Sequence, residues 1–552
     1  MVTPLFSNLG FSAISAQRDV RFRLISVQTN FIFLKYTLFL VTRLNDPAAT
    51  ESEPAINGRP ARQSPLWRRP AVLLAAVALF HVVSPLLLLG AHWWFGIDET
   101  VYLSQINAHV VAGLFSAPRA RGATLIAAPV TLVTTSVAAV RLWVSALSGI
   151  CLYLAFRPWL RLRPGYVVPL AALLFSTVWS VIYYAFEVMP NEWVAFGVLA
   201  ACGYLILYVV DGRRRHGIAV IVTMALVALL RPSDSLYAGL ALVMGALFLR
   251  APMRRRVAAG GAVAAGIAAG LAEWVIEAYV SYGGLGARIH AAQAENGGGG
   301  VHFAGAAQAR ALAGPLLCRN GCRAQARVVY QLWWIALGVL VVVAAVYGVR
   351  RRQLRLVLVP ILVGLGMAAQ YVFGVTYAAP RFLIPAYALL SIPCAIGIGR
   401  LAHLAQSKPL KLVGATAFAL ALAANTALQA HVITAHIAPG ARRFDRVISA
   451  DARLLRTHGV TGACLVLGYP GIDANLAYAA HCTNTPTRLG AVREKIADGD
   501  RIVWNSPTAP PPRAYGLRWR KVLLPATTAS SRYAYVSLPV SRGIAGATPV
   551  PA

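Results

Sequence analysis

Charge is scarce along this chain of 552 residues, of which only 13% are charged. Soluble domains typically carry about 25%. Hydrophobic residues make up 58% of the sequence, its mean hydropathy is +0.62, and long runs with almost no charge recur along it. These properties exclude an ordinary soluble protein and predict an all-α polytopic membrane protein.

Acidic residues are the scarcest charged type: 19 Asp and Glu stand against 51 Lys and Arg, which gives a net charge of +32. A strongly basic protein can be a nucleic-acid binder. Here, however, the basic residues lie mostly in short clusters between apolar runs, as in the cytoplasmic loops of membrane proteins. We therefore expect a lipid bilayer as partner and no nucleic acid.

Familiar catalytic motifs are missing, since the sequence contains no Walker loop, no GxSxG and no HExxH. A cleavable signal peptide is also not evident. Residues 1–70 are instead expected to form a cytoplasmic tail, which is disordered because the stretch 45–65 is polar and rich in proline. The alternative is an over-long start site, in which residues 1–40 are not translated.

About eleven apolar segments between residues 71 and 430 are expected to cross the membrane. Their expected limits are 71–90, 134–156, 166–186, 192–210, 216–230, 235–249, 257–279, 328–349, 356–373, 381–399 and 411–430. A basic cluster follows every second one of them, and such clusters stay in the cytoplasm. This pattern predicts a multi-pass protein with the N-terminus inside and the C-terminus outside. The high usage of Arg and Ala is typical of a GC-rich bacterial genome, so we expect the membrane to be the cytoplasmic membrane.

The expected outer face receives a first loop at 91–133, a long loop at 280–327 and a tail at 431–552. In the first loop, apolar residues at helical spacing predict interfacial helices that lie against the membrane. The tail contains a helix-like segment, a Gly-flanked apolar run and a second helix-like segment, NLAYAAHC. This order predicts a small extracytoplasmic α/β C-terminal domain.

Cysteine is rare as well, with seven residues, of which three lie in predicted spans and four at outer positions. An even number in an oxidising space predicts two disulfides, Cys318–Cys322 and Cys464–Cys482. A metal site at CRNGC is the alternative, but no second cysteine pair of this kind lies nearby.

Two adjacent carboxylates, Asp98 and Glu99, follow the aromatic segment AHWWFG that ends the first span. Aromatic belts mark the membrane interface, so both acids are expected at the outer surface. They either complement the dipole of a helix N-terminus or belong to a site. Their place beside a structured loop favours an active-site carboxylate for Asp98, and it leaves Glu99 open between a helper and a bystander.

Further charged residues lie at the ends of spans on the same expected face. Acids at a membrane edge are costly and usually functional, and arginines there can bind phosphate. Each of these residues also has a purely structural explanation. The acids can complement the dipole at a helix end, Arg231 and Asp234 can pair with each other, and the Arg381 side chain can reach the lipid headgroups. The candidates are Glu187, Glu192, Arg231, Asp234 and Arg381.

The long loop carries His290, Glu295 and His302, which are residue types that bind metals. Four consecutive glycines separate two of them and do not hold ligands in place. The glycines favour a mobile loop over an outer-facing site, which could act as a lid.

The order of these features over 71–400 resembles the GT-C superfamily of polyprenyl-phosphate-sugar-dependent membrane glycosyltransferases. The motifs that carry the resemblance are GIDETVYL, RGATLIAAPVTLVTTSVAAVRLWVSALSGICLYL, VMPNEW, ALLRPSDSLY and PRFLIPAYALL. The most similar branches are the protein mannosyltransferases, the aminoarabinose transferases of lipid A and the RgtA/B/C/D-like bacterial proteins. The resemblance implies a GT-C-like transmembrane domain at 71–430.

It also implies transfer of a hexosyl or pentosyl sugar from a polyprenyl-phosphate donor to a lipid, polysaccharide or protein acceptor of the cell envelope. By motif match, Asp98 is the general base and Glu99 its neighbour. Arg231 and Arg381 would stabilise the departing phosphate. Some branches hold a divalent metal ion, for which Asp98 and Glu192 are the candidates, although the sequence has no clear DxD. The other residues expected at the substrates are Tyr102, Glu192 and Asp234.

A polytopic transporter or lipid flippase is the main alternative. Transporters commonly have internal repeats and place charged residues near the midplane. This sequence has no repeated halves, and its candidate charges lie at one expected face. A non-catalytic envelope assembly protein stays open as a second alternative.

Overall fold

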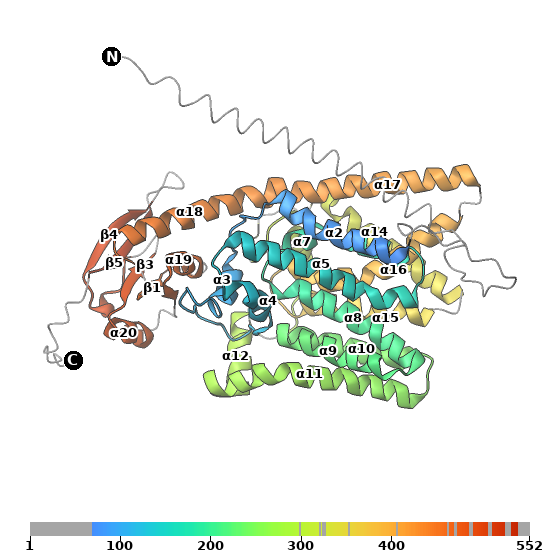
Figure 1. Ribbon diagram of the computed structural model, residues 1–552, viewed down its shortest axis with the longest axis horizontal. Helices are drawn as coiled ribbons and strands as arrows, with labels where there is room; N and C mark the ends of the chain where they lie inside the picture. The colour runs from blue at the N-terminus through green and yellow to red at the C-terminus, as the bar shows by residue number, and fades with distance from the viewer. Residues whose placement is uncertain are drawn as a thin grey trace, which may run out of the picture.

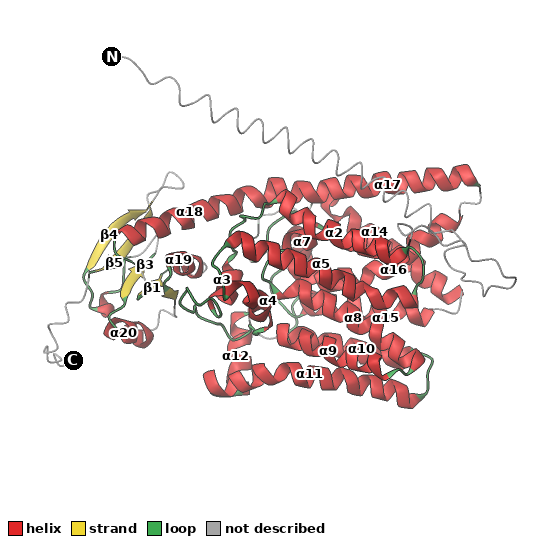
Figure 2. Ribbon diagram, viewed as in Figure 1, coloured by secondary structure: helices red, strands yellow, loops and turns green. Residues whose placement is uncertain are grey.

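Helices dominate the computed structural model and lie side by side in one elongated bundle, with a small sheet at one end (Figure 1, Figure 2). The predicted tail at 1–70 lies outside the described residues apart from its last two. The structure describes residues 69–538 except 297, 299, 320–321, 323–326, 351–353, 405–406, 461–462, 469–471, 485–488, 506–509 and 525–531. The helices of the bundle are α2 (Pro70–Leu88), α5 (Val137–Leu162), α6 (Val167–Ser176), α7 (Trp179–Tyr184), α8 (Pro190–Asp211), α9 (Arg214–Leu230), α10 (Pro232–Phe248), α11 (Met253–Ser281), α14 (Val328–Arg350), α15 (Leu354–Phe373), α16 (Ile384–Leu404) and α17 (Lys408–His431).

A helix lies at each of the predicted spans, and the one predicted at 166–186 is divided into α6 and α7. Among the described residues, 7 helical stretches are long and apolar enough to cross a membrane, and shorter apolar helices accompany them. The predicted all-α polytopic membrane fold is therefore confirmed, together with a small sheet near the C-terminus.

The helices begin and end at residues that favour those positions. Pro190 and Pro232 occupy the first turns of α8 and α10, where a proline loses no hydrogen bond. Ser136 caps α5 by accepting a hydrogen bond from the backbone N–H of Ala139 at 3.3 Å. α8 stops at Gly212, whose φ of 70° is left-handed and therefore suits glycine.

The centre of the bundle is formed by α8 and α16, which are apolar on every side. The apolar part of α16 is buried throughout, and α8 packs against α5, α9 and α16. At the periphery, α14 exposes large apolar side chains such as Val339 and Val342. These exposed faces fit a lipid environment, because such surfaces are rare in soluble monomers.

The first loop contains two short helices, α3 (Ile97–Ser104) and α4 (Gly122–Thr131). The predicted interfacial helix is shorter than expected, because the chain folds back after α3. The Gln105 amide donates to the Gly113 carbonyl at 2.7 Å and closes this turn.

The long loop also contains helices, α12 (Leu285–Glu295) and α13 (Gly305–Ala311). Helices thus form part of this loop, and two of its four consecutive glycines lie outside the described residues.

A single helical rod leads from the bundle to the sheet. α17 continues through a π-helical turn, η4 (Val432–Ile437), into α18 (Ala438–Thr457), and the helices run end to end along the bundle (Figure 1). The sheet has the order β2-β1-β3-β5-β4, in which β1 pairs in parallel with β2 and β3, and β5 pairs antiparallel with both β3 and β4. Its strands are β1 (Cys464–Leu467), β2 (Thr483–Asn484), β3 (Arg501–Trp504), β4 (Trp519–Leu524) and β5 (Arg532–Ser537).

The sheet has a small core on each face. α18 and α19 (Asp473–Ala480) cover one face, and α20 (Leu489–Ala497) covers the other. One disulfide joins Cys464 on β1 to Cys482 after α19, and a second joins Cys318 to Cys322 in the loop before α14.

Candidate functional site

Asp98 lies in the first turn of α3, at the end of the bundle that faces the sheet, and two arginines hold it. Its Oδ1 accepts a hydrogen bond from Arg119 Nη2 at 2.8 Å, and its Oδ2 accepts one from Arg381 Nη2 at 3.0 Å. About a third of the Asp98 side chain is exposed (33%). The carboxylate is thus paired and still within reach of solvent.

Burial alone would raise the pKa of Asp98, but the charges of Arg119 and Arg381 outweigh it and lower that pKa to about 2. Asp98 is therefore ionised at every physiological pH. Such a low pKa makes the carboxylate a weak base while both arginines hold it. Its basicity would rise if either arginine turned to another anion.

Arg231 and Asp234 form an ion pair where α9 ends and α10 begins, with Arg231 Nε at 3.2 Å from Asp234 Oδ2. Asp234 is buried and also accepts hydrogen bonds from the Tyr371 hydroxyl at 2.5 Å and the Gln370 amide at 3.1 Å. The guanidinium of Arg231 lies 5.7 Å from the centre of the Tyr371 ring. Asp234 is thus an anchor that holds Arg231, and this pairing was one of the alternatives seen in the sequence.

Aromatic side chains orient the other two arginines. The Arg119 guanidinium lies 5.2 Å from the centre of the buried Tyr102 ring, and Arg381 Nη1 donates to the Tyr184 hydroxyl at 3.4 Å. The charge of Arg231 also acts on Asp98. The cluster thus contains three guanidinium groups, those of Arg119, Arg231 and Arg381, and two carboxylates, those of Asp98 and Asp234. This surplus of positive charge favours an anionic ligand.

Glu99 is the neighbour of Asp98 but has a different environment. It is buried and forms a bidentate pair with Arg141 at 2.7 and 2.8 Å, and it also accepts the backbone N–H groups of Val188 and Gly96, each at 2.7 Å. Arg141 is itself buried and donates to three backbone carbonyls as well. Glu99 therefore ties the start of α3 to α5 and to the segment before α8.

Glu192 lies inside the bundle, away from solvent. His81 Nε2 on α2 lies 3.0 Å from one of its oxygens, and the Ser148 hydroxyl on α5 donates to the other at 3.0 Å. All three side chains are buried. The carboxylate that the sequence placed at the substrates is thus occupied by contacts that join α2, α5 and α8.

A divalent metal ion does not fit beside Asp98, because two guanidinium groups already occupy its oxygens and would repel a cation. Across the described part of the chain, no group of three or more His, Cys, Asp or Glu side chains could hold a metal ion. Glu295, one of the metal-type residues of the long loop, instead accepts the backbone N–H of Ala117 at 3.4 Å.

Glu187 lies between α7 and α8 and is buried. Burial, together with the charge of Glu99, raises the pKa of Glu187 well above its ordinary value. This shift favours the protonated, uncharged form of the Glu187 carboxyl.

A cavity of about 740 Å³ borders the segment that leads into Asp98. Residues 89–97 form one wall, and residues 436–445 at the start of α18 form another. Its lining combines the aromatic rings of Trp93 and Tyr183 with the charged side chains of Arg442 and Asp445. A second cavity, of about 620 Å³, lies among apolar side chains of α6, α14, α16 and α17.

The sequence pointed to Asp98, Arg231 and Arg381 but not to Arg119 or Arg141. Arg119 lies in a loop on the expected outer face, against the positive-inside trend, which is the signal that selected Arg381. Arg141 lies within a predicted span, where a charge is a functional signal by itself. Both signals are present in the sequence, but only the fold shows which carboxylate each arginine binds.

No protein-family model and no curated protein matches the chain in sequence. Solved structures do match its fold. ArnT from Cupriavidus metallidurans, bound to undecaprenyl phosphate, is 12% identical with a TM-score of 0.55, over 86% of this chain and 99% of that one. The oligosaccharyltransferase AglB from Archaeoglobus fulgidus, in complex with an inhibitory peptide and a dolichol-phosphate, is 10% identical with a TM-score of 0.51, over 78% and 69%. The chain has the GT-C fold that its motifs resemble.

Proposed function

We propose that this protein is a membrane glycosyltransferase that moves a sugar from a polyprenyl-phosphate donor to an envelope acceptor. In this proposal the reaction takes place beside Asp98. The observation that carries the proposal is the position of Asp98 between Arg119 and Arg381, with Arg231 beside them, at one end of a GT-C bundle. Two proteins of similar fold bind undecaprenyl phosphate and dolichol-phosphate. A surplus of arginine charge at a membrane edge suits the phosphate of such a lipid.

In the proposed reaction, the donor phosphate draws the arginines toward itself and leaves Asp98 less tightly paired. The acceptor hydroxyl then gives its proton to Asp98 while its oxygen attacks C1 of the sugar. The bond between C1 and the phosphate oxygen breaks, and the electron pair leaves with the polyprenyl phosphate. Arg119, Arg231 and Arg381 stabilise the negative charge of that leaving group. In this scheme Glu99 positions α3 and takes no part in proton transfer.

The two cavities support substrates that are partly lipid and partly carbohydrate. The cavity beside residues 89–97 offers aromatic faces and charged groups, which are the partners of sugar rings and hydroxyls, so we assign it to the acceptor. The apolar cavity among α6, α14, α16 and α17 is suited to a hydrocarbon chain.

We propose that the end of the bundle with Asp98 and the sheet faces the outside of the cytoplasmic membrane. Both disulfides support this orientation, because disulfides persist in oxidising compartments. Cys464–Cys482 lies within the sheet region, and Cys318 pairs in a backbone bridge with Ala378, close in sequence to Arg381.

The test is sugar transfer by the purified protein in liposomes, with radiolabelled undecaprenyl-phosphate-linked hexoses and pentoses as donors and envelope extract as acceptor. We expect Asp98→Asn to lower transfer by at least about 100-fold, the scale at which general bases act. Asp498→Asn is the matched control, since Asp498 is an exposed acid in the turn after α20 and forms a surface ion pair with Lys495. Full transfer by Asp98→Asn would exclude the assignment. Movement of a solute without any donor would favour the transporter.

A further inference from the structure

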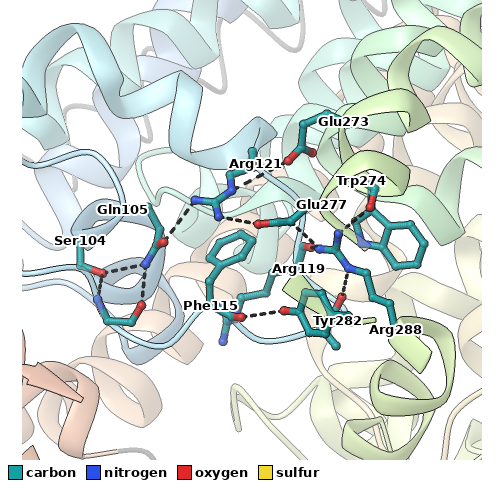
Figure 3. Close-up of polar contacts among 12 residues, drawn as sticks. Ser104, Gln105, Phe115, Arg119, Arg121, Glu273, Trp274, Glu277, Tyr282 and Arg288 are labelled. Atoms are coloured by element: carbon teal, nitrogen blue, oxygen red, sulfur yellow. Dashed lines mark hydrogen bonds and ion pairs between the residues drawn. The ribbon is translucent and has the colours of Figure 1, made fainter. Parts of the chain in front are cut away.

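Three charged residues connect the first loop to the helices α11 and α12: Arg121, Glu277 and Arg288. Figure 3 shows the Glu277 carboxylate between the two guanidinium groups. Arg121 Nη2 donates to one Glu277 oxygen at 2.5 Å, and Arg288 Nη2 donates to the other at 2.7 Å. Both oxygens of Glu277 are therefore engaged by arginines from different segments.

Arg288 also holds the backbone of the loop. Its Nε donates to the carbonyl of Ala117 at 3.2 Å, and its Nη2 donates to the carbonyl of Arg119 at 3.1 Å. The Tyr282 hydroxyl donates to the carbonyl of Phe115 at 2.9 Å. Alternate carbonyls of this segment thus each accept a hydrogen bond from α12 or from the residue that follows α11.

The burial of Arg288 makes this arrangement specific. Its side chain is fully buried (0%), and an unpaired charge there would be strongly destabilising. Nη1 donates to the carbonyl of Trp274 at 2.6 Å, so each nitrogen of the guanidinium has an acceptor. The side chain can keep all these partners only if the segment 115–121 stays where it is.

Arg119 lies within that segment, and its side chain holds Asp98. The contacts therefore run from Glu277 to Arg288, from Arg288 to the backbone at Arg119, and from Arg119 to Asp98. We propose that Glu277 and Arg288 are positioning residues that fix Arg119 against Asp98. This inference rests on the proposed function, and neither residue has been assigned a role by the motifs or by the likeness of fold.

The first test substitutes Glu277→Gln, which keeps the shape of the side chain and removes the charge shared by the two arginines. We expect the rate of transfer to fall by about 10- to 100-fold, because small displacements of a catalytic group have effects of this size. Glu273→Gln is the matched control. Glu273 lies one turn earlier on α11 and approaches Arg121 only to 3.9 Å, so its substitution should change the rate by less than about twofold. Arg288→Lys keeps the positive charge but removes the planar guanidinium group with its several donors. We expect it to lower the rate of transfer as much as Glu277→Gln does.

A double-mutant cycle separates positioning from a general loss of structure. If Glu277 acts through Arg119, then Glu277→Gln should have little further effect in an Arg119→Ala background. An equal loss in both backgrounds would overturn the proposal.

Limited digestion with trypsin gives a readout that needs no transfer activity. Cleavage after Arg119 and Arg121 should be slow in the wild type and faster in Glu277→Gln, relative to cleavage after the exposed Arg442. Unchanged cleavage would contradict the positioning role. Faster cleavage in a protein that shows no transfer in any form would uphold the positioning of the loop and reject the proposed function.

Discussion

Asp98 and Glu99 are neighbours in α3, yet they lie in opposite environments. Glu99 is buried, and its oxygens are taken by Arg141 and by two backbone N–H groups. Asp98 is partly exposed, and side chains alone hold it. Backbone donors cannot leave without unfolding the segment, whereas arginine side chains can turn to another anion. The first environment builds an anchor, and the second leaves a carboxylate able to react.

Glu99→Gln should have the largest effect on stability of the substitutions that test this difference between Glu99 and Asp98. The amide cannot replace the bidentate ion pair, so the charge of the buried Arg141 would lose its partner. Breaking a buried pair from one side costs about 3–5 kcal/mol. We expect little correctly folded protein, measured as the yield of monodisperse protein in detergent and as the midpoint of thermal unfolding.

Asp98→Asn is the matched comparison for that experiment. It changes the adjacent acid in the same helix, and it should lower the yield and the unfolding midpoint much less than Glu99→Gln does, because the arginines that hold the partly exposed Asp98 remain in reach of solvent. A stable and active Glu99→Gln protein would show that Glu99 is no anchor. If Asp98→Asn lowered the yield and the unfolding midpoint as much as Glu99→Gln, the two carboxylates would not differ in their structural role.

Much of the fold follows from local sequence. Apolar runs predicted the bundle helices because burial in lipid requires helices of that length. The Arg231–Asp234 pair was also visible, since its members lie three residues apart at the start of a helix. Such features depend on composition and on short spacings, which are preserved in the sequence.

The remaining contacts of the site depend on long-range packing. Arg381 meets Asp98 across 283 residues, and Arg141 meets Glu99 across 42. Glu192 could be placed at the end of a helix but not on a particular side of it. Its contacts with His81 and Ser148 arise only when α2 and α5 pack against α8. Sequence reasoning could therefore find charged residues but not decide which of them meet.

Ligand binding tests whether the arginines that hold Asp98 can turn to another anion. Undecaprenyl phosphate should raise the thermal unfolding midpoint of the wild type, since a ligand at 100 times its Kd stabilises a protein by about 2.7 kcal/mol. Arg381→Ala should lower the affinity by roughly tenfold, which is about 1.4 kcal/mol. The readout is the ligand-dependent shift of the midpoint.

Two controls define that result. Undecaprenol, which lacks the phosphate, should produce no such shift. Arg493→Ala removes an exposed arginine on α20, which lines neither cavity, and should leave the response to undecaprenyl phosphate unchanged. If Arg381→Ala responds as strongly as the wild type, the phosphate does not bind at the arginines beside Asp98.

The smallest expected effect concerns pH. The pKa of Asp98 is lowered to about 2 in the folded protein, against about 3.9 in an unfolded chain. Its ion pairs therefore stabilise the fold above the unfolded value, and this contribution is lost as the pH falls toward 2. Arg119→Ala should return the pKa of Asp98 toward its ordinary range and remove part of this stabilisation.

The difference in unfolding midpoint between wild type and Arg119→Ala should thus be widest near pH 6 and should narrow below pH 4. The same substitution in an Asp98→Asn background should give a gap that does not vary with pH. If the gap narrows equally in both backgrounds, Asp98 is not the group that titrates, and the contrast with Glu99 loses its electrostatic basis.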